Sequence, residues 1–395
     1  MTQNLFVSIG SSDRPEARRA GQEAAQQAAA GLAGPARLAL VFGSSWFHQE
    51  QLLQGVRAVA REVPLIGGST AGEILPEGPV SHTCVVILMA SDSLRCGIGA
   101  GRDVHLQPRE AGHQAALSAA QELRDASRTG FLLIGDGLST GYGQVTRGIQ
   151  DVLGTSAVIA GGMAGDDLRF TKTYQYCNGQ VLERAVVGAL FGGVTWGVGI
   201  AHGFAPISKP RCATRAAANV LYELDTLPAA AVYEDYFGPV AARRLREEGL
   251  TRSGSAYPLG IRSESADYWL LRNVLALQAD GSLLCSGEIP EGASLQLMIG
   301  SKQLAMDAAA AAARQAVEPM EHPAFALLLE SASRLKLLGR EQAAMEIARI
   351  RQVIGRDVPI AGCYTYGEQA PLAAGTSGAM AVQTGSVLVL VFGGS

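Results

Sequence analysis

One short phrase recurs along this chain, and the repetition constrains the fold more than any other feature. Residues 63–73 read VPLIGGSTAGE, and residues 358–368 read VPIAGCYTYGE. A weaker copy, VIAGGMAGD, occupies residues 158–166. Each copy predicts an apolar strand, a Gly-rich turn and then an acidic residue. Repetition on this scale indicates that one supersecondary unit has been copied and that the copies pack against one another.

The segments around the copies repeat as well. An apolar run and a helix-like stretch precede each copy, and another apolar run follows it. The sequence therefore predicts an α/β protein with mixed sheets flanked by helices, built from repeated strand–helix–strand units with internal pseudo-symmetry. A fourth, degraded copy at residues 286–292 (SGEIPEG) is as good an explanation of that segment as chance similarity to residues 71–78.

Two lobes are expected from the length of 395 residues, which exceeds one ordinary core. The pattern changes from Val194 onward, where small and apolar residues alternate up to Gly203. We therefore predict two domains, 1–203 and 204–395. Neither side carries a low-complexity linker, so the lobes are expected to be in close contact.

Composition excludes several classes of protein. The formal net charge is −4, which argues against a nucleic-acid-binding surface. No apolar run approaches the roughly 18 residues of a membrane span, and the N-terminus carries no signal-peptide pattern. The six cysteines are scattered without a Cys-x-x-Cys pair, which is typical of a reduced protein without a zinc site. A cytoplasmic protein is the resulting prediction.

These phrases resemble those of the FIST family, whose name stands for F-box and intracellular signal transduction proteins. The turn at residues 67–73 is similar to the hallmark of its N-terminal domain. Three further segments resemble the C-terminal domain of the family: HGFAPI at 202–207, YELD at 222–225 and the closing GCYTYGE at 362–368. The similarity extends over roughly residues 30–395, nearly the whole chain.

The resemblance implies an intracellular sensor that binds a small ligand and signals through a separate partner. Stand-alone members of this length resemble haem-binding nitric-oxide sensors that regulate a histidine kinase. The alternative that the family implies is a haem-free sensor of an amino acid or similar small anion. Family members often carry a Cys and a His-Asn pair where this chain has ESASR at 330–334 and GTSG at 375–378, so those positions are not assigned a role.

The two clearest signature turns are the predicted ligand site. Backbone N–H groups at consecutive glycines, with nearby hydroxyls, can form a nest for an anion, and an acidic residue can meet an ammonium group. Tight packing between the repeated units explains the same glycines equally well. The candidate residues are Gly67, Gly68, Ser69, Thr70, Gly72, Glu73, Gly362, Cys363, Tyr364, Tyr366, Gly367 and Glu368.

Haem would need an axial donor, for which neutral imidazole is a common choice. His202 ends an apolar strand and His48 follows Trp46-Phe47, so these two histidines are the candidates. A satisfied structural histidine is the alternative for each. No catalytic motif is present, so an enzyme is not expected; an activity that uses Glu73 with Glu368, or Cys363, is the remaining alternative.

Overall fold

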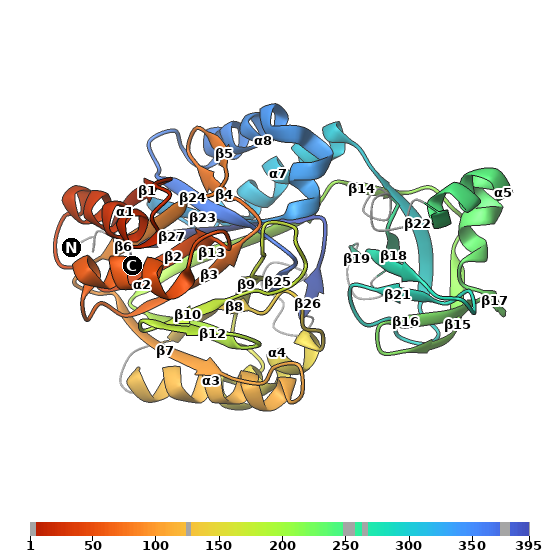
Figure 1. Ribbon diagram of the computed structural model, residues 1–395, viewed down its shortest axis with the longest axis horizontal. Helices are drawn as coiled ribbons and strands as arrows, with labels where there is room; N and C mark the ends of the chain where they lie inside the picture. The colour runs from red at the N-terminus through yellow and green to blue at the C-terminus, as the bar shows by residue number, and fades with distance from the viewer. Residues whose placement is uncertain (1–4, 124–127, 248–256, 263–267, 372–379, 395) are drawn as a thin grey trace.

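The computed structural model describes residues 5–123, 128–247, 257–262, 268–371 and 380–394. It consists of a large body and a smaller lobe, which is inserted between β13 and α7 (Figure 1). The body contains three units with one order of elements, and each unit contains one copy of the signature phrase.

The first unit, residues 6–90, contains β1 (Phe6–Ser12), α1 (Ala17–Gly31), β2 (Leu38–Ser44), α2 (Gln49–Ala60), β3 (Leu65–Thr70), β4 (Glu73–Leu75), β5 (Gly78–Val80) and β6 (Cys84–Ala90). The second unit, residues 95–192, contains β7 (Arg95–Gly101), α3 (Pro108–Glu122), β8 (Arg128–Gly135), α4 (Tyr142–Leu153), β9 (Ile159–Met163), β10 (Gln175–Cys177), β11 (Gln180–Leu182) and β12 (Val186–Gly192).

The third unit is interrupted by the lobe and comprises residues 194–202 and 302–394. It contains β13 (Val194–His202), α7 (Lys302–Val317), β23 (Pro323–Ser331), α8 (Ala332–Ile354), β24 (Ile360–Thr365), β25 (Glu368–Pro371), β26 (Met380–Gln383) and β27 (Ser386–Gly394). The lobe thus begins at the predicted boundary near residue 203, but the chain returns to the body after Gly300.

Each unit contributes four strands to one six-stranded sheet and a two-stranded hairpin to the sheet of another unit. The sheet orders are β1-β6-β2-β3-β10-β11, β7-β12-β8-β9-β25-β26 and β13-β27-β23-β24-β4-β5. In each sheet the two strands that flank the second helix of the unit pair in parallel, and the borrowed hairpin then pairs antiparallel. The shared strand order confirms mixed sheets; a rotation that relates the units stays a prediction.

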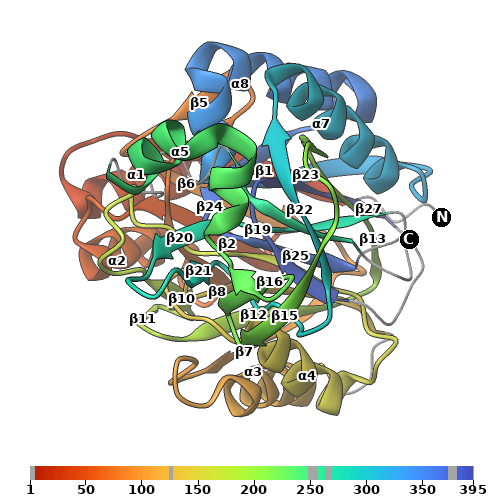
Figure 2. The same ribbon diagram turned by 90° about the vertical axis from the view of Figure 1, so that its right-hand side faces the viewer.

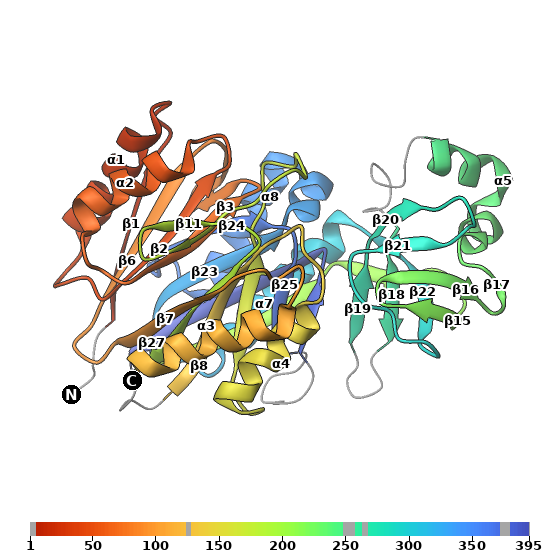
Figure 3. The same cartoon turned by 60° about the horizontal axis from the view of Figure 1, so that its bottom comes forward.

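The inner faces of the three sheets pack on a common core. It includes Phe42 of the first unit, Phe191 of the second and Phe392 of the third. The rings of Phe191 and Phe392 lie 5.4 Å apart between centroids. On the outside, each sheet is covered by its own two helices, so the units meet through buried apolar side chains (Figure 3).

The alanine-rich helices pack closely against the glycine-rich strands. A Cβ atom at Gly99 in β7 would lie 2.1 Å from the carbonyl oxygen of Ala115 in α3. One at Gly199 in β13 would lie 1.9 Å from that of Ala312 in α7. Helix and sheet therefore approach at backbone contact distance, which only glycine on the strand permits.

The inserted lobe, residues 204–300, has a sheet of a different kind. It contains β14 (Phe204–Pro206), β15 (Arg211–Ala217), β16 (Val220–Leu224), β17 (Leu227–Pro228), α5 (Ala231–Glu247), β18 (Leu259–Arg262), β19 (Trp269–Arg272), β20 (Val274–Leu277), β21 (Leu283–Cys285) and β22 (Ser294–Gly300). Every described strand pair in it is antiparallel. Residues 286–292 lie here, between β21 and β22, without the parallel pair that each signature copy has. The fourth-copy interpretation is therefore wrong.

Among the described residues, no helix is long and apolar enough to cross a membrane.

Candidate functional site

The three signature turns meet and bond to one another through their backbones. The Ala71 amide donates to the Tyr364 carbonyl at 2.9 Å, and the Tyr364 amide donates to Gly72 at 2.8 Å. The Gly165 amide donates to Ser69 at 3.0 Å, and the Met163 amide to the Gly367 carbonyl at 2.8 Å. Much of the polar backbone of these turns thus holds the units together, as the packing interpretation of the glycines requires.

Several of the predicted ligand residues also have packing roles. A Cβ atom at Gly67 would lie 1.8 Å from the Val41 carbonyl oxygen, and one at Gly362 would lie 1.8 Å from that of Leu328. One at Gly68 would lie 2.8 Å from the Tyr174 carbonyl oxygen. These glycines are needed because neighbouring backbone passes directly over them.

Two other predicted residues are held by neighbouring turns. The Ser69 hydroxyl donates to the Gly165 carbonyl at 2.7 Å and accepts the Tyr174 amide at 2.8 Å. The Tyr366 hydroxyl donates to the Asp166 carboxylate, and its ring stacks on Phe170 at 4.7 Å between centroids.

Glu73 starts β4 and is fully buried. Its carboxyl accepts the Thr70 hydroxyl and, at 3.1 Å, the Thr83 amide. Burial raises the pKa of Glu73 to about 8, because removal from water disfavours the charged form more than these hydrogen bonds favour it. Glu73 is therefore a neutral acid at pH 7.

Glu368 occupies the same position at the start of β25 and is also fully buried. The Thr365 hydroxyl donates to its Oε1 at 2.5 Å, and the Ser386 hydroxyl donates to its Oε2 at 2.5 Å. Burial raises its pKa to about 8, as for Glu73. Each acid thus bonds to the Thr three residues before it.

Gln175, and not Asp166, is the structural counterpart of these acids in the second unit. Gln175 starts β10 and pairs with Gly68, as Glu73 pairs with Cys363 and Glu368 with Gly162. The Gln175 amide group donates to the Thr173 hydroxyl and accepts the Ala185 amide, both at 3.1 Å. Sequence reasoning missed this residue because a longer loop separates it from its signature glycines.

Asp166 instead organises that longer loop. Its carboxylate accepts the amides of Phe170 at 2.8 Å, Thr171 at 2.6 Å and Lys172 at 2.9 Å. Burial opposes its ionisation, but the hydrogen bonds from Tyr366 and these amides outweigh it and lower the pKa of Asp166. The loop contains left-handed backbone at Asp167, Leu168 and Phe170.

A second group of buried polar side chains lies beside Glu368, at the carboxyl ends of β23 and β24. We call Glu330, Arg334, Glu346 and Tyr364 the polar cluster. Each is at most 1% exposed. Arg334 pairs with Glu346 and donates to the carbonyls of Ala305 at 2.9 Å and Gly385 at 3.3 Å.

The polar cluster has an unusual number of unpartnered atoms. Seven buried side-chain polar atoms in the described part of the chain have no hydrogen-bond partner, and five belong to the cluster. They are both carboxyl oxygens of Glu330, Oε2 of Glu346, Nε of Arg334 and the Tyr364 hydroxyl. Buried polar groups are rarely left unpaired in folded proteins, so these atoms call for a partner such as water, an ion or a ligand.

Protonation relieves part of this deficit. Burial, together with the neighbouring Glu346 carboxylate, raises the pKa of Glu330 well above its usual range. Burial therefore favours the protonated form of Glu330, whose proton can be shared with Glu346. Sequence analysis assigned a role only to Tyr364 of the cluster. Glu330 and Arg334 lie in the segment 330–334 that was left without a role, and Glu346 belongs to no recurring phrase.

The two candidate axial histidines, His202 and His48, differ in burial and in hydrogen bonding. His202 is hydrogen-bonded through both ring nitrogens, from Nε2 to the Trp269 carbonyl at 3.0 Å and from the Phe204 amide to Nδ1 at 3.3 Å. Burial lowers its pKa to about 4, so the ring is neutral. His48 lies on the surface, 3.3 Å from Glu50. Among the described residues, no group of three or more His, Cys, Asp or Glu could hold a metal ion.

Cys363 is 2% exposed, and burial raises the pKa of its thiol well above its usual range. It packs in the common core among apolar side chains. A buried neutral thiol is a poor nucleophile.

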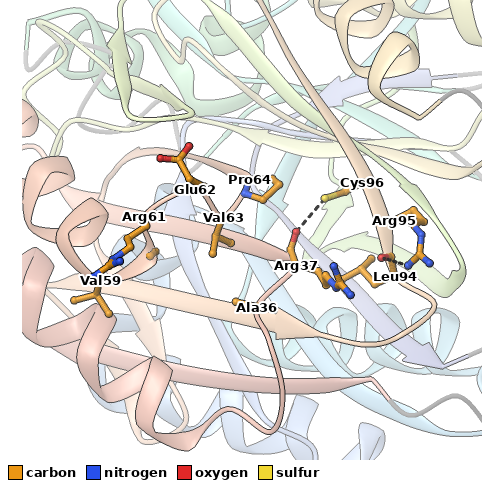
Figure 4. Close-up of a pocket in the computed structure, with 11 residues that line it drawn as sticks. Ala36, Arg37, Val59, Arg61, Glu62, Val63, Pro64, Leu94, Arg95 and Cys96 are labelled. Atoms are coloured by element: carbon orange, nitrogen blue, oxygen red, sulfur yellow. Dashed lines mark hydrogen bonds between the residues drawn. The ribbon is translucent and has the colours of Figure 1, made fainter.

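A surface groove of about 490 Å³ lies at the opposite ends of the strands (Figure 4). It is lined by the segments that lead into β2 and β3, including Arg37 and Pro64, and by Arg95 and Cys96 at the start of β7. Val63 and Pro64 at the start of the first signature copy line it, but no histidine and no residue of a Gly-rich signature turn does. The groove is therefore separate from the signature turns.

Comparison with known proteins identifies the family. Residues 37–226 match the FIST N domain, and residues 229–371 match the FIST C domain. The chain belongs to the FIST family. FIST domains are sensor domains of signal transduction, so the resemblance seen in the sequence is confirmed.

Individual relatives of this FIST protein add little about its ligand. An uncharacterized protein of Methanocaldococcus jannaschii is 26% identical over 204 residues, which are 48% of this chain and 39% of that protein. The chain thus spans well under half the length of this relative.

Solved structures are only distantly similar. A cyanuric acid hydrolase from A. caulinodans matches over 99% of both chains with 10% identity and a TM-score of 0.39. Phosphoribosylformylglycinamidine synthase II of Thermotoga maritima matches over 99% of this chain and 72% of that chain, with 12% identity and a TM-score of 0.24.

Proposed function

We propose that this FIST protein is a haem-free sensor, not an enzyme, and that its polar cluster binds the head group of an α-amino acid. The support is the match between unpartnered atoms and ligand chemistry. Three carboxyl oxygens of Glu330 and Glu346 can accept the three N–H groups of an ammonium. Arg334 Nε and the Tyr364 hydroxyl can donate to a carboxylate.

Charge balance favours an ammonium group beside Glu330. With Glu330 protonated in the free protein, the ion pair of Arg334 with Glu346 leaves the polar cluster without net charge. A bound ammonium that replaces the proton of Glu330 keeps this balance, and the carboxylate of the ligand then adds one negative charge beside Arg334. Binding therefore releases a proton, and the affinity should rise with pH for as long as Glu330 is protonated in the free protein.

The test is a thermal unfolding screen with each of the twenty L-amino acids, followed by calorimetric titration of any hit. A ligand at about 100 times its Kd should stabilise the protein by about 2.7 kcal/mol. Titration in buffers of different ionisation enthalpy should show release of a proton. Tyr364→Phe should weaken binding about ten-fold, whereas Tyr366→Phe, on the same turn but outside the cluster, should not.

Two outcomes would overturn this proposal. The first is that no amino acid stabilises the protein. The second is that Tyr364→Phe binds a hit as tightly as the unaltered chain does.

The family resemblance supplies the competing proposal, a haem protein that responds to nitric oxide and regulates a separate histidine kinase. An absorption spectrum of protein expressed with added haem precursor tests it. A stoichiometric Soret band that shifts with nitric oxide and is lost in His202→Ala or His48→Ala would favour haem. A colourless protein that does not take up added haem would leave the amino-acid proposal.

A further inference from the structure

We infer that the inserted lobe responds to the state of the polar cluster through one short turn, residues 382–386, which we call the coupling turn. That a ligand causes the response rests on the proposed function. The connection between the polar cluster and the lobe through the coupling turn does not. The coupling turn links β26 to β27. It contacts the lobe on one side and the buried acids on the other.

The lobe is attached to the body at two neighbouring points. Only Gly203 separates β13 in the body from β14 in the lobe, and only Ser301 separates β22 from α7. The two crossings lie side by side, because Phe204 pairs with Gly300. Viewed from the lobe, Figure 2 shows it in front of the body. Adjacent single-residue crossings provide a hinge about which the lobe can turn.

Away from the hinge, three polar contacts of the lobe converge on the coupling turn. The Tyr268 hydroxyl donates to the Gln383 side chain. Arg272 donates to the Val382 carbonyl at 3.1 Å, and the Ser286 and Thr384 hydroxyls lie 3.5 Å apart. At Gly385 the backbone is left-handed, and an added Cβ atom would lie 2.9 Å from the Phe204 ring.

The opposite side of the coupling turn bonds to the buried groups. The Ser386 hydroxyl donates to Glu368 at 2.5 Å, and Arg334 donates to the Gly385 carbonyl at 3.3 Å. Gln383 also pairs with Glu368 in the β25–β26 register. A change in the bonds of Arg334 or Glu368 therefore alters the segment on which the lobe rests.

The first unit provides an internal control. Glu73 has the same position and the same bond from a Thr as Glu368. Its other hydrogen bond comes from the Thr83 amide, and Thr83 lies ahead of β6 in the first unit, outside the coupling turn. Thr70→Val and Thr365→Val thus remove the same hydroxyl from equivalent acids, and only Thr365→Val acts on the acid that the coupling turn contacts.

The experiment is hydrogen exchange of the full-length protein without ligand, measured by mass spectrometry on peptides that cover β18 and β19. Thr365→Val and Ser386→Ala should each accelerate exchange in these lobe strands about five-fold. Thr70→Val should leave them unchanged. By reciprocity, Tyr268→Phe should accelerate exchange in β25.

Equal effects of Thr365→Val and Thr70→Val on the lobe peptides would overturn the inference, and so would no effect of Ser386→Ala. Because no ligand is present, this result is separable from the amino-acid screen. Failure of the screen alone would refute the ligand, and failure of the exchange experiment alone would refute the coupling.

Discussion

The turns of the first and third units begin alike and differ in their surroundings. Glu73 and Glu368 start equivalent strands, bond to a Thr three residues earlier and have their pKa raised to about 8 by burial. In the first unit, the buried Gln49 donates to backbone carbonyls and accepts the Tyr176 hydroxyl. Beside Glu368 lies the polar cluster with its five unpartnered atoms.

The difference shows how a repeated architecture can acquire one site. The glycines and turn acids recur because the units pack in the same way, so they belong to the fold. The polar cluster occurs in the unit that also carries the inserted lobe. Specialisation of this kind arises from residues outside the repeated phrase.

Loss of the Arg334 guanidinium in the third unit should have the largest effect on the free energy of unfolding. Arg334→Met leaves Glu346 buried without its partner, which should lower the free energy of unfolding by about 3–5 kcal/mol. Arg340→Met is the control in α8, beyond the kink at Gly339, because Arg340 is exposed and bonds to Ser81 at the surface. It should cost less than about 1 kcal/mol. Urea unfolding measures both.

A smaller loss for Arg334→Met, equal to that of Arg340→Met, would show that Glu346 finds another partner. The double variant Arg334→Met with Glu346→Leu should recover most of the lost stability, since it removes the charge that was left unpaired.

The two turn acids should make equal contributions to the pH dependence of stability. Each has a folded pKa of about 8, above the ordinary carboxyl value. The folded state therefore binds more protons, and stability falls as pH rises from about 4.5 to 8, by up to about 1.4 kcal/mol per pH unit for each acid. Glu73→Gln and Glu368→Gln should each remove the contribution of one acid to this fall in stability with pH. Denaturant unfolding from pH 5 to pH 8 measures it.

An unchanged slope in either variant would mean that this carboxyl is already ionised in the folded protein at neutral pH. If only Glu368→Gln kept the full slope, Arg334 would be holding Glu368 charged, and the two turns would differ electrostatically as well as in their neighbours.

The smallest change in stability is expected for a substitution in the second unit. Gln175→Glu preserves the shape of the side chain, and a neutral carboxyl can still donate to Thr173 and accept the Ala185 amide. The variant should lose less than about 1 kcal/mol at pH 5. It should also make the fall in stability with rising pH steeper, as one more buried carboxyl of raised pKa would. A large loss at pH 5 would contradict the equivalence of Gln175 with the turn acids.

The sequence was most informative where the fold repeats. The strands that flank each signature copy, the Gly-rich turns and the placement of Glu73 and Glu368 are local consequences of the phrase. It misassigned the second unit, because twelve residues lie between Gly162 and Gln175, whereas only four lie between Gly68 and Glu73. Spacing alone could not show that strand pairing resumes at Gln175. Residues 375–378, where the chain departs from the family pattern, lie outside the described residues.

By itself, the sequence determined the family and the α/β class, because glycine spacing and apolar runs act through local backbone geometry and burial. Only the tertiary structure decided that each unit lends a hairpin to another and that the lobe is an insertion. It also decided that Glu330, Arg334, Glu346 and Tyr364 meet. These depend on contacts between residues distant in the chain, and a buried ion pair leaves no periodic pattern in the sequence.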